Sequence, residues 1–263
     1  MLTIVSYNIR RQSSLYKKMV ELVKNNSNVI VAIQERPSIQ EMKKISQRMP
    51  KCVKHQYFTN RNELAVIHSS SLSVLLRNIE RGSFDKRLFD ERALVVSIPL
   101  KNGNFDIVNV HGYSKMHKDS VTLNNKLFEM IKDLQKSSKH IIIGDFNINP
   151  YEEHWMHNQG IFLSYRNISS VKNLNHNDVI YYNPCWKYMC ERSFPEGTIF
   201  YDKCMLQWAM FDQVLIAKSL VDENSFRNFE IPQKLGTFLI LEKNCSKKKY
   251  CSDHLPIKLT LEV

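Results

Sequence analysis

The stretch from residue 140 to residue 150 reads HIIIGDFNINP, in which three isoleucines and a glycine lead into Asp145, Asn147 and Asn149. An unbroken apolar run of this kind is typical of a strand that is buried on both faces. A glycine at the end of such a strand indicates that backbone or a ligand approaches closely there. The stretch therefore predicts a central strand that delivers a carboxylate and amides to the edge of a sheet.

Polar side chains stand at the ends of other apolar segments in the same way. They are Asn8 at the end of LTIVSYN, Glu35 at the end of VIVAIQE, His111 at the end of FDIVNVH, Asp212 in MFDQVLI, and Asp253 with His254 in SDHLPIKL. If these strand ends lie at one edge of the sheets, the side chains converge on a single cleft. Taken singly, each residue has a structural explanation as a turn residue, a helix cap or a surface charge. The ordered set is what indicates a functional site.

The apolar periodicity predicts an α+β fold in which two mixed sheets pack together with helices outside. Helical spacing runs from Leu15 to Val23 and from Leu123 to Leu134. We find no internal repeat, low-complexity tract or linker, so we expect one domain over residues 1–263 with an irregular insertion at about 151–207. The expected strands are 2–7, 29–33, 63–68, 72–79, 92–100, 104–110, 140–144, 211–216, 236–242 and 256–262.

The composition favours a polyanionic partner. The chain has 263 residues, and 37 Lys and Arg residues against 26 Asp and Glu residues give a net charge of +11. Such a balance is typical of proteins that bind nucleic acid or an acidic membrane surface, although basic charge can also serve solubility alone. The chain shows no secretion signal and no apolar run of the roughly 20 residues that span a bilayer, so we expect a cytoplasmic protein without membrane insertion. Its six cysteines form no C-x-x-C pair, which makes a zinc site a minor alternative and reduced thiols the expectation.

Oxygen ligands for a hard divalent cation are present in this set. Glu35 and Asp253 supply carboxylates for Mg²⁺ or Mn²⁺, and Asn8 can add an amide oxygen. A metal bound there would offset the charge that develops on a phosphate under attack. The metal hypothesis therefore points to phosphoester cleavage.

The remaining side chains are suited to proton transfer. Asp145 can orient or deprotonate an attacking water, and Asn147 can donate a hydrogen bond to a phosphate oxygen. His254, held by a carboxylate such as Asp212, can bind the phosphate or exchange a proton. His111 can protonate the leaving group. This chemistry needs no serine or cysteine nucleophile.

With these residues in this order, the sequence resembles the endonuclease/exonuclease/phosphatase superfamily, which includes deoxyribonuclease I. The motifs that carry the resemblance are SYNIR, QE, VNVHG, GDFNINP, FDQVLI and SDHLPI, from residue 6 to residue 257. The resemblance implies a four-layer αββα sandwich, a divalent metal and hydrolysis of a phosphoester. It also implies that Glu35 binds the metal with Asn8, Asp145, Asn147 and Asp253 close by, and that Asp212 pairs with His254 at the scissile phosphate.

Departures from the superfamily and the basic clusters bear on the substrate. Abasic-site endonucleases usually carry an acidic residue where this chain has Arg10, and His111 resembles the branch that contains deoxyribonuclease I and the sphingomyelinases. Arg10, Arg11 and Lys248 lie next to site segments and can contact phosphates, unless they are solvated loop charges. Aromatic residues between Tyr181 and Tyr201 can stack bases or pack a local core.

We therefore expect a divalent-metal-dependent phosphodiesterase, in particular a nuclease that hydrolyses DNA or RNA by in-line attack of an activated water. One alternative is a phosphatase or phosphodiesterase for a small substrate such as a cyclic oligonucleotide, an inositol phosphate or sphingomyelin. The other is a non-catalytic nucleic-acid-binding module of the same fold.

Overall fold

A computed structural model describes most of the chain, and the statements below concern the residues that it describes. These residues are 1–48, 55–60, 63–69, 71–77, 86–101, 103–134, 139–152, 163–173, 180–190, 194–201, 207–236, 238–239 and 252–263. Lys248, Cys245 and Cys251 lie outside them, as does part of the strand expected at 236–242.

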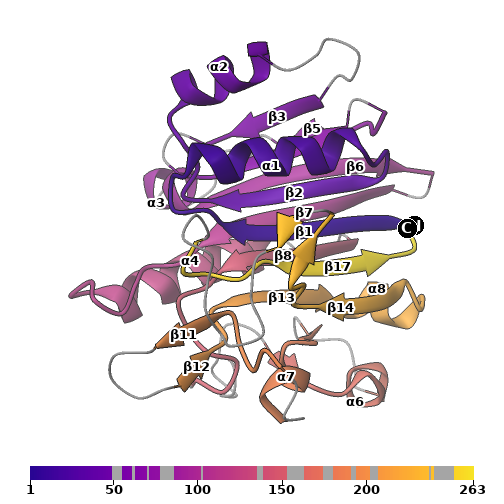
Figure 1. Cartoon of the computed structure of the whole chain (residues 1–263). Helices are drawn as coiled ribbons and strands as arrows, with labels where there is room; N and C mark the ends of the chain where they lie inside the picture. The colour runs from indigo at the N-terminus through magenta and orange to yellow at the C-terminus, as the bar shows by residue number, and fades with distance from the viewer. Residues whose placement is uncertain are drawn as a thin grey trace.

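Two mixed β-sheets form the body of the protein (Figure 1). Within the described residues, the strands of the first sheet are, in spatial order, β14 (Phe226–Glu230), β17 (Ile257–Leu261), β1 (Leu2–Asn8), β2 (Val29–Gln34), β4 (Ala65–Ser69) and β3 (His55–Thr59). Those of the second are β5 (Leu75–Leu76), β6 (Ala93–Leu100), β7 (Gly103–His111), β8 (Lys139–Asp145), β13 (Asp212–Ala217), β10 (Ile180–Tyr182) and β9 (Leu163–Tyr165). Two short hairpins stand apart from these sheets: β11 (Ile199–Tyr201) with β12 (Gln207–Ala209), and β15 (Lys234–Leu235) with β16 (Phe238–Leu239).

The pairing within each sheet places several strand ends at the same edge. Strand β1 runs parallel to β2, and β7 runs parallel to β8, so the carboxyl ends of each pair lie together. Strand β13 runs antiparallel to β8, which brings the start of β13 to the end of β8. Figure 1 also shows that the two termini lie close together, because the last strand, β17, pairs with β1.

Helices lie on the outer faces of the sheets. They are α1 (Ser13–Lys24), α2 (Ile39–Arg48), α3 (Lys86–Arg92), α4 (Ser120–Leu134), α6 (Ile168–Asn173), α7 (Trp186–Cys190) and α8 (Lys218–Asp222). The apolar side of α1, which includes Met19 and Val23, packs against the first sheet. Helix α4 packs Leu127 and Ile131 against the second sheet. No helix in the described part of the chain is long and apolar enough to cross a membrane.

The isoleucine run of β8 shows why the sequence specifies this layering. Ile141 and Ile143 are fully buried in the core that the two sheets share. Ile142, on the opposite face, is fully buried in the core beneath α4. A strand covered on both faces has to be apolar at successive positions, because its side chains alternate between the two faces. Two mixed sheets between helices confirm the predicted α+β sandwich.

The stretch from 151 to 207, which we expect to be irregular, contains short regular elements. Strand β10 pairs with β13 and β9 pairs with β10, so this stretch extends the second sheet. Three of its tyrosines pack inward. Tyr181 is fully buried and its hydroxyl forms a hydrogen bond of 2.8 Å with His140. Tyr182 and Tyr188 contact Phe226 and Phe229 edge to face. Local packing therefore accounts for these three tyrosines without a role in base stacking.

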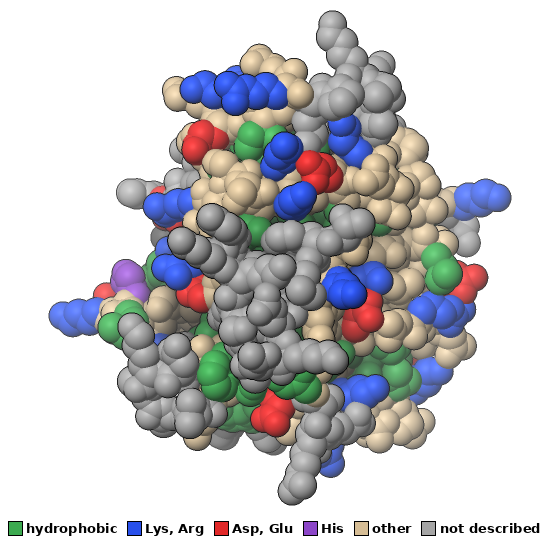
Figure 2. Space-filling model, in the orientation of Figure 1, with side chains coloured by type: hydrophobic (Ala, Val, Ile, Leu, Met, Phe, Trp, Pro, Cys, Tyr) green, Lys and Arg blue, Asp and Glu red, His purple; other side chains and the backbone are tan. Residues whose placement is uncertain are grey.

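The surface view places charges of both signs side by side. In Figure 2, Lys and Arg side chains are spread widely over the visible face, and Asp and Glu side chains lie among them. Lys17 and Lys18 belong to the exposed side of α1, where Lys18 pairs with Glu21 at 3.3 Å. These two lysines therefore belong to a solvated helix face.

Candidate active site

Three strand ends of the second sheet meet in register. His111 at the end of β7 lies opposite Asp145 at the end of β8, and Asp145 lies opposite Asp212 at the start of β13. Asn8 ends β1 and Glu35 follows β2 in the first sheet, at the edge that faces them. The structure thus brings together, from both sheets, five polar side chains that the sequence singles out.

Gly144 makes the close approach of β8 to β7 possible. A Cβ atom at this position would lie 2.0 Å from the carbonyl oxygen of Val110, and the residue has a φ of +149°. Any side chain would push the two strands apart or force a strained backbone. The glycine ahead of Asp145 is therefore required by strand pairing next to the site.

Asp145 Oδ2 lies at the centre of the cluster. It accepts a hydrogen bond from Asn8 Nδ2 at 3.1 Å. His254 Nε2 lies 3.6 Å from the same oxygen and His111 Nε2 lies 3.8 Å from it. Distances of this length are longer than hydrogen bonds, so neither imidazole is hydrogen-bonded to this oxygen. The two rings instead flank a position next to the carboxylate. A water molecule or phosphate oxygen at that position would meet both ring nitrogens.

His254 is backed by Asp212. Its Nδ1 donates a hydrogen bond of 2.8 Å to Asp212 Oδ2, and both side chains are buried. Burial alone would lower the pKa of His254, but the charges of Asp212 and Asp145 outweigh it and raise that pKa to about 9. The imidazole therefore carries a proton at neutral pH and presents Nε2–H toward Asp145.

His111 is backed by Glu63, a residue that the strand-end pattern does not single out. His111 Nδ1 lies 3.1 Å from Glu63 Oε2, although the ring N–H is not aligned as a hydrogen bond. Glu63 is also paired with Arg11 and Arg92. Contact with His111 is the main cause that lowers the pKa of Glu63 to about 2, against the opposing effect of burial and with help from Arg11 and Arg92. Glu63 is therefore ionised, and the site contains two histidines that each lie against a carboxylate.

Glu35 and Asp145 are carboxylates of the kind that bind hard cations. Asn8 Nδ2 donates to Glu35 Oε1 at 3.0 Å as well as to Asp145, so carboxylates from the two sheets flank one amide group. Among the described residues, no group of three or more His, Cys, Asp or Glu side chains is arranged to hold a metal ion. The donor chemistry nevertheless fits a hard divalent cation, whose charge would offset the repulsion between the two carboxylates.

Asp253, Asn147 and the basic residues make other contacts. Asp253 pairs with Arg10 at 2.9 Å, and both side chains are about half exposed. The Asn147 amide nitrogen donates to the Gly112 carbonyl at 3.0 Å, and its backbone N–H donates to Asp145 Oδ1 at 2.9 Å. Asn147 therefore orients Asp145. Arg11 is turned toward Glu63.

Left-handed backbone conformations gather at this site. Five described residues other than glycine have a positive φ, and the four at the site are Arg10 (+47°), Arg11 (+57°), Glu35 (+48°) and Asn147 (+56°). Such a conformation costs a residue with a side chain roughly 1–3 kcal/mol, and it persists where the surrounding structure enforces it. The backbone is thus held in position where the polar side chains converge.

A buried hydrogen-bond network ties the loop after β8 to the start of β13. Gln213 Nε2 donates to the carbonyl oxygens of Ile148 and Met210 at 2.5 and 3.0 Å. Asn149 Oδ1 accepts a hydrogen bond of 2.8 Å from the Met210 N–H. Because both side chains are buried, these bonds fix the end of β8 relative to β13. Asn149, the third polar residue of the stretch 140–150, thus holds the site in place through Met210 and does not belong to the polar cluster.

Comparison with known proteins bears on the fold. No protein-family model and no curated protein sequence matches the chain. Solved structures do match over the whole chain. The catalytic domain of Xenopus laevis APE2 has a TM-score of 0.61 at 16% identity and covers 99% of this chain and 91% of that one. An AP endonuclease from Archaeoglobus fulgidus has a TM-score of 0.57 at 15% identity, with 100% of both chains covered. A 3′–5′ exonuclease from Neisseria meningitidis has a TM-score of 0.61 at 12% identity, again with 100% of both chains covered.

These similarities extend over the whole fold, because nearly all of this chain is covered in each case. The protein therefore shares the overall fold of these solved structures, with two mixed β-sheets between helices, as its sequence predicts.

Proposed function

We propose that this protein is a divalent-metal-dependent phosphodiesterase that hydrolyses nucleic acid. The observation that carries the proposal is the convergence of two carboxylate-backed histidines, His111 and His254, on Asp145 Oδ2. In-line cleavage of a phosphodiester requires a group that accepts a proton from the attacking water and a group on the opposite side of the phosphate that donates a proton to the leaving oxygen. His111 and Asp145 are 34 residues apart and Asp145 and His254 are 109 apart, so the convergence follows from the fold and not from local sequence.

His254 is suited to bind the phosphate. It is protonated at neutral pH because Asp212 and Asp145 raise its pKa to about 9. A protonated imidazole in a buried position donates a charge-assisted hydrogen bond to a non-bridging phosphate oxygen. Asp212 keeps the ring oriented, since it holds Nδ1–H and leaves Nε2–H directed at the site. We assign His254 the stabilisation of the negative charge that grows on the phosphate.

Asp145 and His111 are placed for proton transfer. Asp145 Oδ1 is held by the Asn147 N–H, whereas Oδ2 faces both imidazoles and can accept a proton from an attacking water. We assign His111 the protonation of the leaving oxygen, with Glu63 stabilising the charged imidazole. Both residues are largely buried.

Glu35 and Asp145, with Asn8 beside them, are the residues that we assign to a Mg²⁺ or Mn²⁺ ion. Such an ion would offset negative charge on the phosphate and on the leaving oxygen. Asp253 can join them when Arg10 releases it, because its pair with Arg10 is exposed and therefore weak.

Nucleic acid is the substrate class that the charge balance favours. The net charge of +11 suits a polyanion, and the similar solved structures include an AP endonuclease and a 3′–5′ exonuclease. Arg10 and Arg11 lie at the rim of the site on an exposed turn. We assign both arginines to contacts with substrate phosphates.

The test is cleavage of labelled single- and double-stranded DNA and RNA with Mg²⁺, with Mn²⁺ and with EDTA. Wild type is compared with Asp145→Asn and with Asp222→Asn, a matched control that removes an exposed carboxylate of α8 outside the site. We expect metal-dependent cleavage that the control retains and that Asp145→Asn lowers by at least about a hundredfold.

Two outcomes would contradict the proposal. Cleavage that is unchanged in Asp145→Asn would place the reaction elsewhere. Folded wild-type protein that cleaves no strand would exclude a general nuclease. A panel of cyclic dinucleotides, inositol phosphates and sphingomyelin would then test a small-substrate enzyme, and strand binding without turnover would indicate a binding module.

A further inference from the structure

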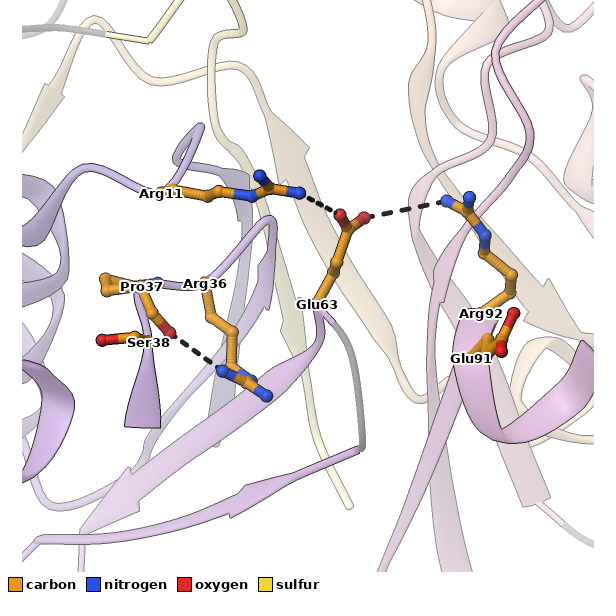
Figure 3. Close-up of a pocket in the computed structure, with 7 residues that line it drawn as sticks. All are labelled: Arg11, Arg36, Pro37, Ser38, Glu63, Glu91 and Arg92. Atoms are coloured by element: carbon orange, nitrogen blue, oxygen red, sulfur yellow. Dashed lines mark hydrogen bonds and ion pairs between the residues drawn. The ribbon is translucent and has the colours of Figure 1, made fainter. Parts of the chain in front are cut away.

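A charged pocket lies beside the candidate active site, on the His111 side. It has a volume of about 380 Å³. Figure 3 shows the residues that line it: Arg11, Arg36, Pro37, Ser38, Glu63, Glu91 and Arg92. One wall is the segment between β2 and α2, and the other is the end of α3. The pocket therefore opens between the two sheets, as the active site does.

Three arginines line this pocket. The side chain of Arg11 is 67% exposed and that of Arg92 is 24% exposed, so an incoming ligand can reach both. Arg36 is buried and is fixed by hydrogen bonds from Nη1 to the Pro37 carbonyl at 2.9 Å and from Nη2 to the Asn60 carbonyl at 3.2 Å. The lining thus combines one fixed guanidinium with two that a ligand can reach, and all three carry N–H donors.

Glu63 organises the arginines without cancelling their charge. It stands between Arg11 and Arg92 and is paired with both (Figure 3). With Glu91, the lining contains two carboxylates against three guanidiniums. Each guanidinium has five N–H donors, and Arg11 and Arg92 each meet Glu63 through a single nitrogen. The lining thus keeps a net positive charge and N–H groups that an anion can engage.

Helix α2 begins at the pocket. Ser38 lines the pocket, and its Oγ accepts a hydrogen bond from the N–H of Glu41 at 3.2 Å, which marks the start of the helix. The amino end of a helix carries partial positive charge and favours anions. The Glu41 carboxylate already accepts hydrogen bonds from the Ser38 N–H at 3.1 Å and from the Ser38 hydroxyl at 2.8 Å, so the arginines and not the helix end carry the anion binding.

We propose that this pocket binds a second phosphate group of the substrate, next to the phosphate that is cleaved. The inference rests on the proposed function. Planar guanidinium forks match the oxygens of phosphate, and the charged lining offers little to an apolar ligand. Glu63 contacts His111 on one side and the arginines on the other, so the pocket begins one side-chain pair away from the reacting position. A neighbouring phosphodiester or a terminal phosphomonoester presents this same chemistry.

The test measures binding apart from cleavage. Fluorescence anisotropy in EDTA gives the Kd of short labelled strands for wild type, Arg11→Gln and Arg92→Gln, and a gel confirms that each strand is intact afterwards. Arg227→Gln is the matched control, because it removes one exposed positive charge that pairs with Glu262 near the carboxyl end of the chain. We expect the two pocket variants to bind about ten- to a hundredfold more weakly, and the control to bind within about twofold of wild type.

Neutralising one phosphate at a time identifies the bound group. The strands carry a 5′-phosphate or a 5′-hydroxyl, and single methylphosphonate linkages at successive positions. If the pocket binds one phosphate, there should be one strand position at which the effects are not additive. At that position, the neutral linkage and Arg92→Gln together should weaken binding no more than either change alone. A terminal position would identify a phosphomonoester, and an internal one a phosphodiester; either supports the proposal. Arginine effects that add fully to every neutralisation, or that do not exceed the effect of Arg227→Gln, would overturn it.

A second probe keeps this inference separate from the proposed function. If wild type neither cleaves nor binds any strand, the nuclease proposal fails while the pocket can still be tested with inorganic pyrophosphate by calorimetry. Binding to wild type that Arg92→Gln weakens at least about tenfold would support an anion pocket. Equal binding to both proteins, or none to wild type, would overturn it. Thermal unfolding of each variant establishes that it is folded.

Discussion

Raising the pH of the metal-free protein should weaken its fold through His254. In the folded state, burial lowers the pKa of this imidazole, while Asp212 and Asp145 outweigh burial and raise it to about 9. In the unfolded chain the pKa is about 6.5. Because the folded value is the higher one, the stabilisation is fully present below pH 6.5 and is lost as the pH rises through 9.

The size of the effect follows from the two pKa values. Their difference is 9 minus 6.5, and each pH unit corresponds to about 1.4 kcal/mol, so the contribution is roughly 3 kcal/mol. His254 is buried, so solvent screening reduces this figure little. A change of this size is a large fraction of the stability of an ordinary domain.

Urea unfolding in EDTA at intervals from about pH 6 to about pH 10 measures it. EDTA removes divalent cations, so the protein's own charges set the result. The control is His254→Gln, which can still donate a hydrogen bond to Asp212 but does not titrate. Tyrosines and cysteines titrate in both proteins, so subtracting one curve from the other isolates His254. A difference that stays constant across this range would refute the assignment of a protonated, carboxylate-held imidazole.

Three further substitutions test other parts of the account. Asp212→Asn should lower the pKa of His254, seen by NMR of the ring protons, and should lower kcat about 10²- to 10⁴-fold at neutral pH; an unchanged ring titration would contradict this. The pKa of Glu63 is lowered to about 2, so the stability that this carboxylate contributes is present above pH 4.5 and is lost as the pH falls through 2. The free energy of unfolding of Glu63→Gln, measured in urea, should lack this pH dependence. Wild-type and variant stabilities that change in parallel with pH would contradict the lowered pKa. Gly144→Ala should destabilise the protein by at least about 2 kcal/mol because its Cβ would meet the Val110 carbonyl, whereas Gly236→Ala, with open space around it, should cost about 1 kcal/mol; equal losses in thermal unfolding would refute the close approach.

The layering of the fold was accessible from sequence because burial on two faces leaves a clear pattern. The isoleucine run of β8 and the helical spacing of α1 and α4 each predict their element. In place of the strand expected at 72–79, the described residues form a strand only at Leu75–Leu76. The sequence interpretation did not predict helix α2. A signal for α2 was present, since Ser38 and Glu41 form a capping box with hydrogen bonds of 2.8 and 3.2 Å. Short strands such as β9 and β10 have too few residues to show periodicity.

The site was partly accessible for a geometric reason. Parallel neighbours place their carboxyl ends at one edge, which brings Asn8 beside Glu35 in the first sheet and His111 beside Asp145 in the second. An antiparallel neighbour contributes its start to that edge, as Asp212 does. Glu63, just ahead of β4, follows this second rule because β4 runs antiparallel to β2. Applied to β4, the rule would have identified Glu63; the arginine pocket, which depends on how α2 and α3 pack, follows no such rule.

The most direct test of the central claim is the single-turnover rate of metal-dependent strand cleavage by wild type, His111→Ala, His254→Ala and the double variant. Two histidines that act on one phosphate predict that each single change lowers the rate by at least about a hundredfold, with all four proteins folded. The double variant should retain no more than the slower single variant. A wild-type rate in either single variant, or cleavage that survives the loss of both imidazoles, would contradict the account.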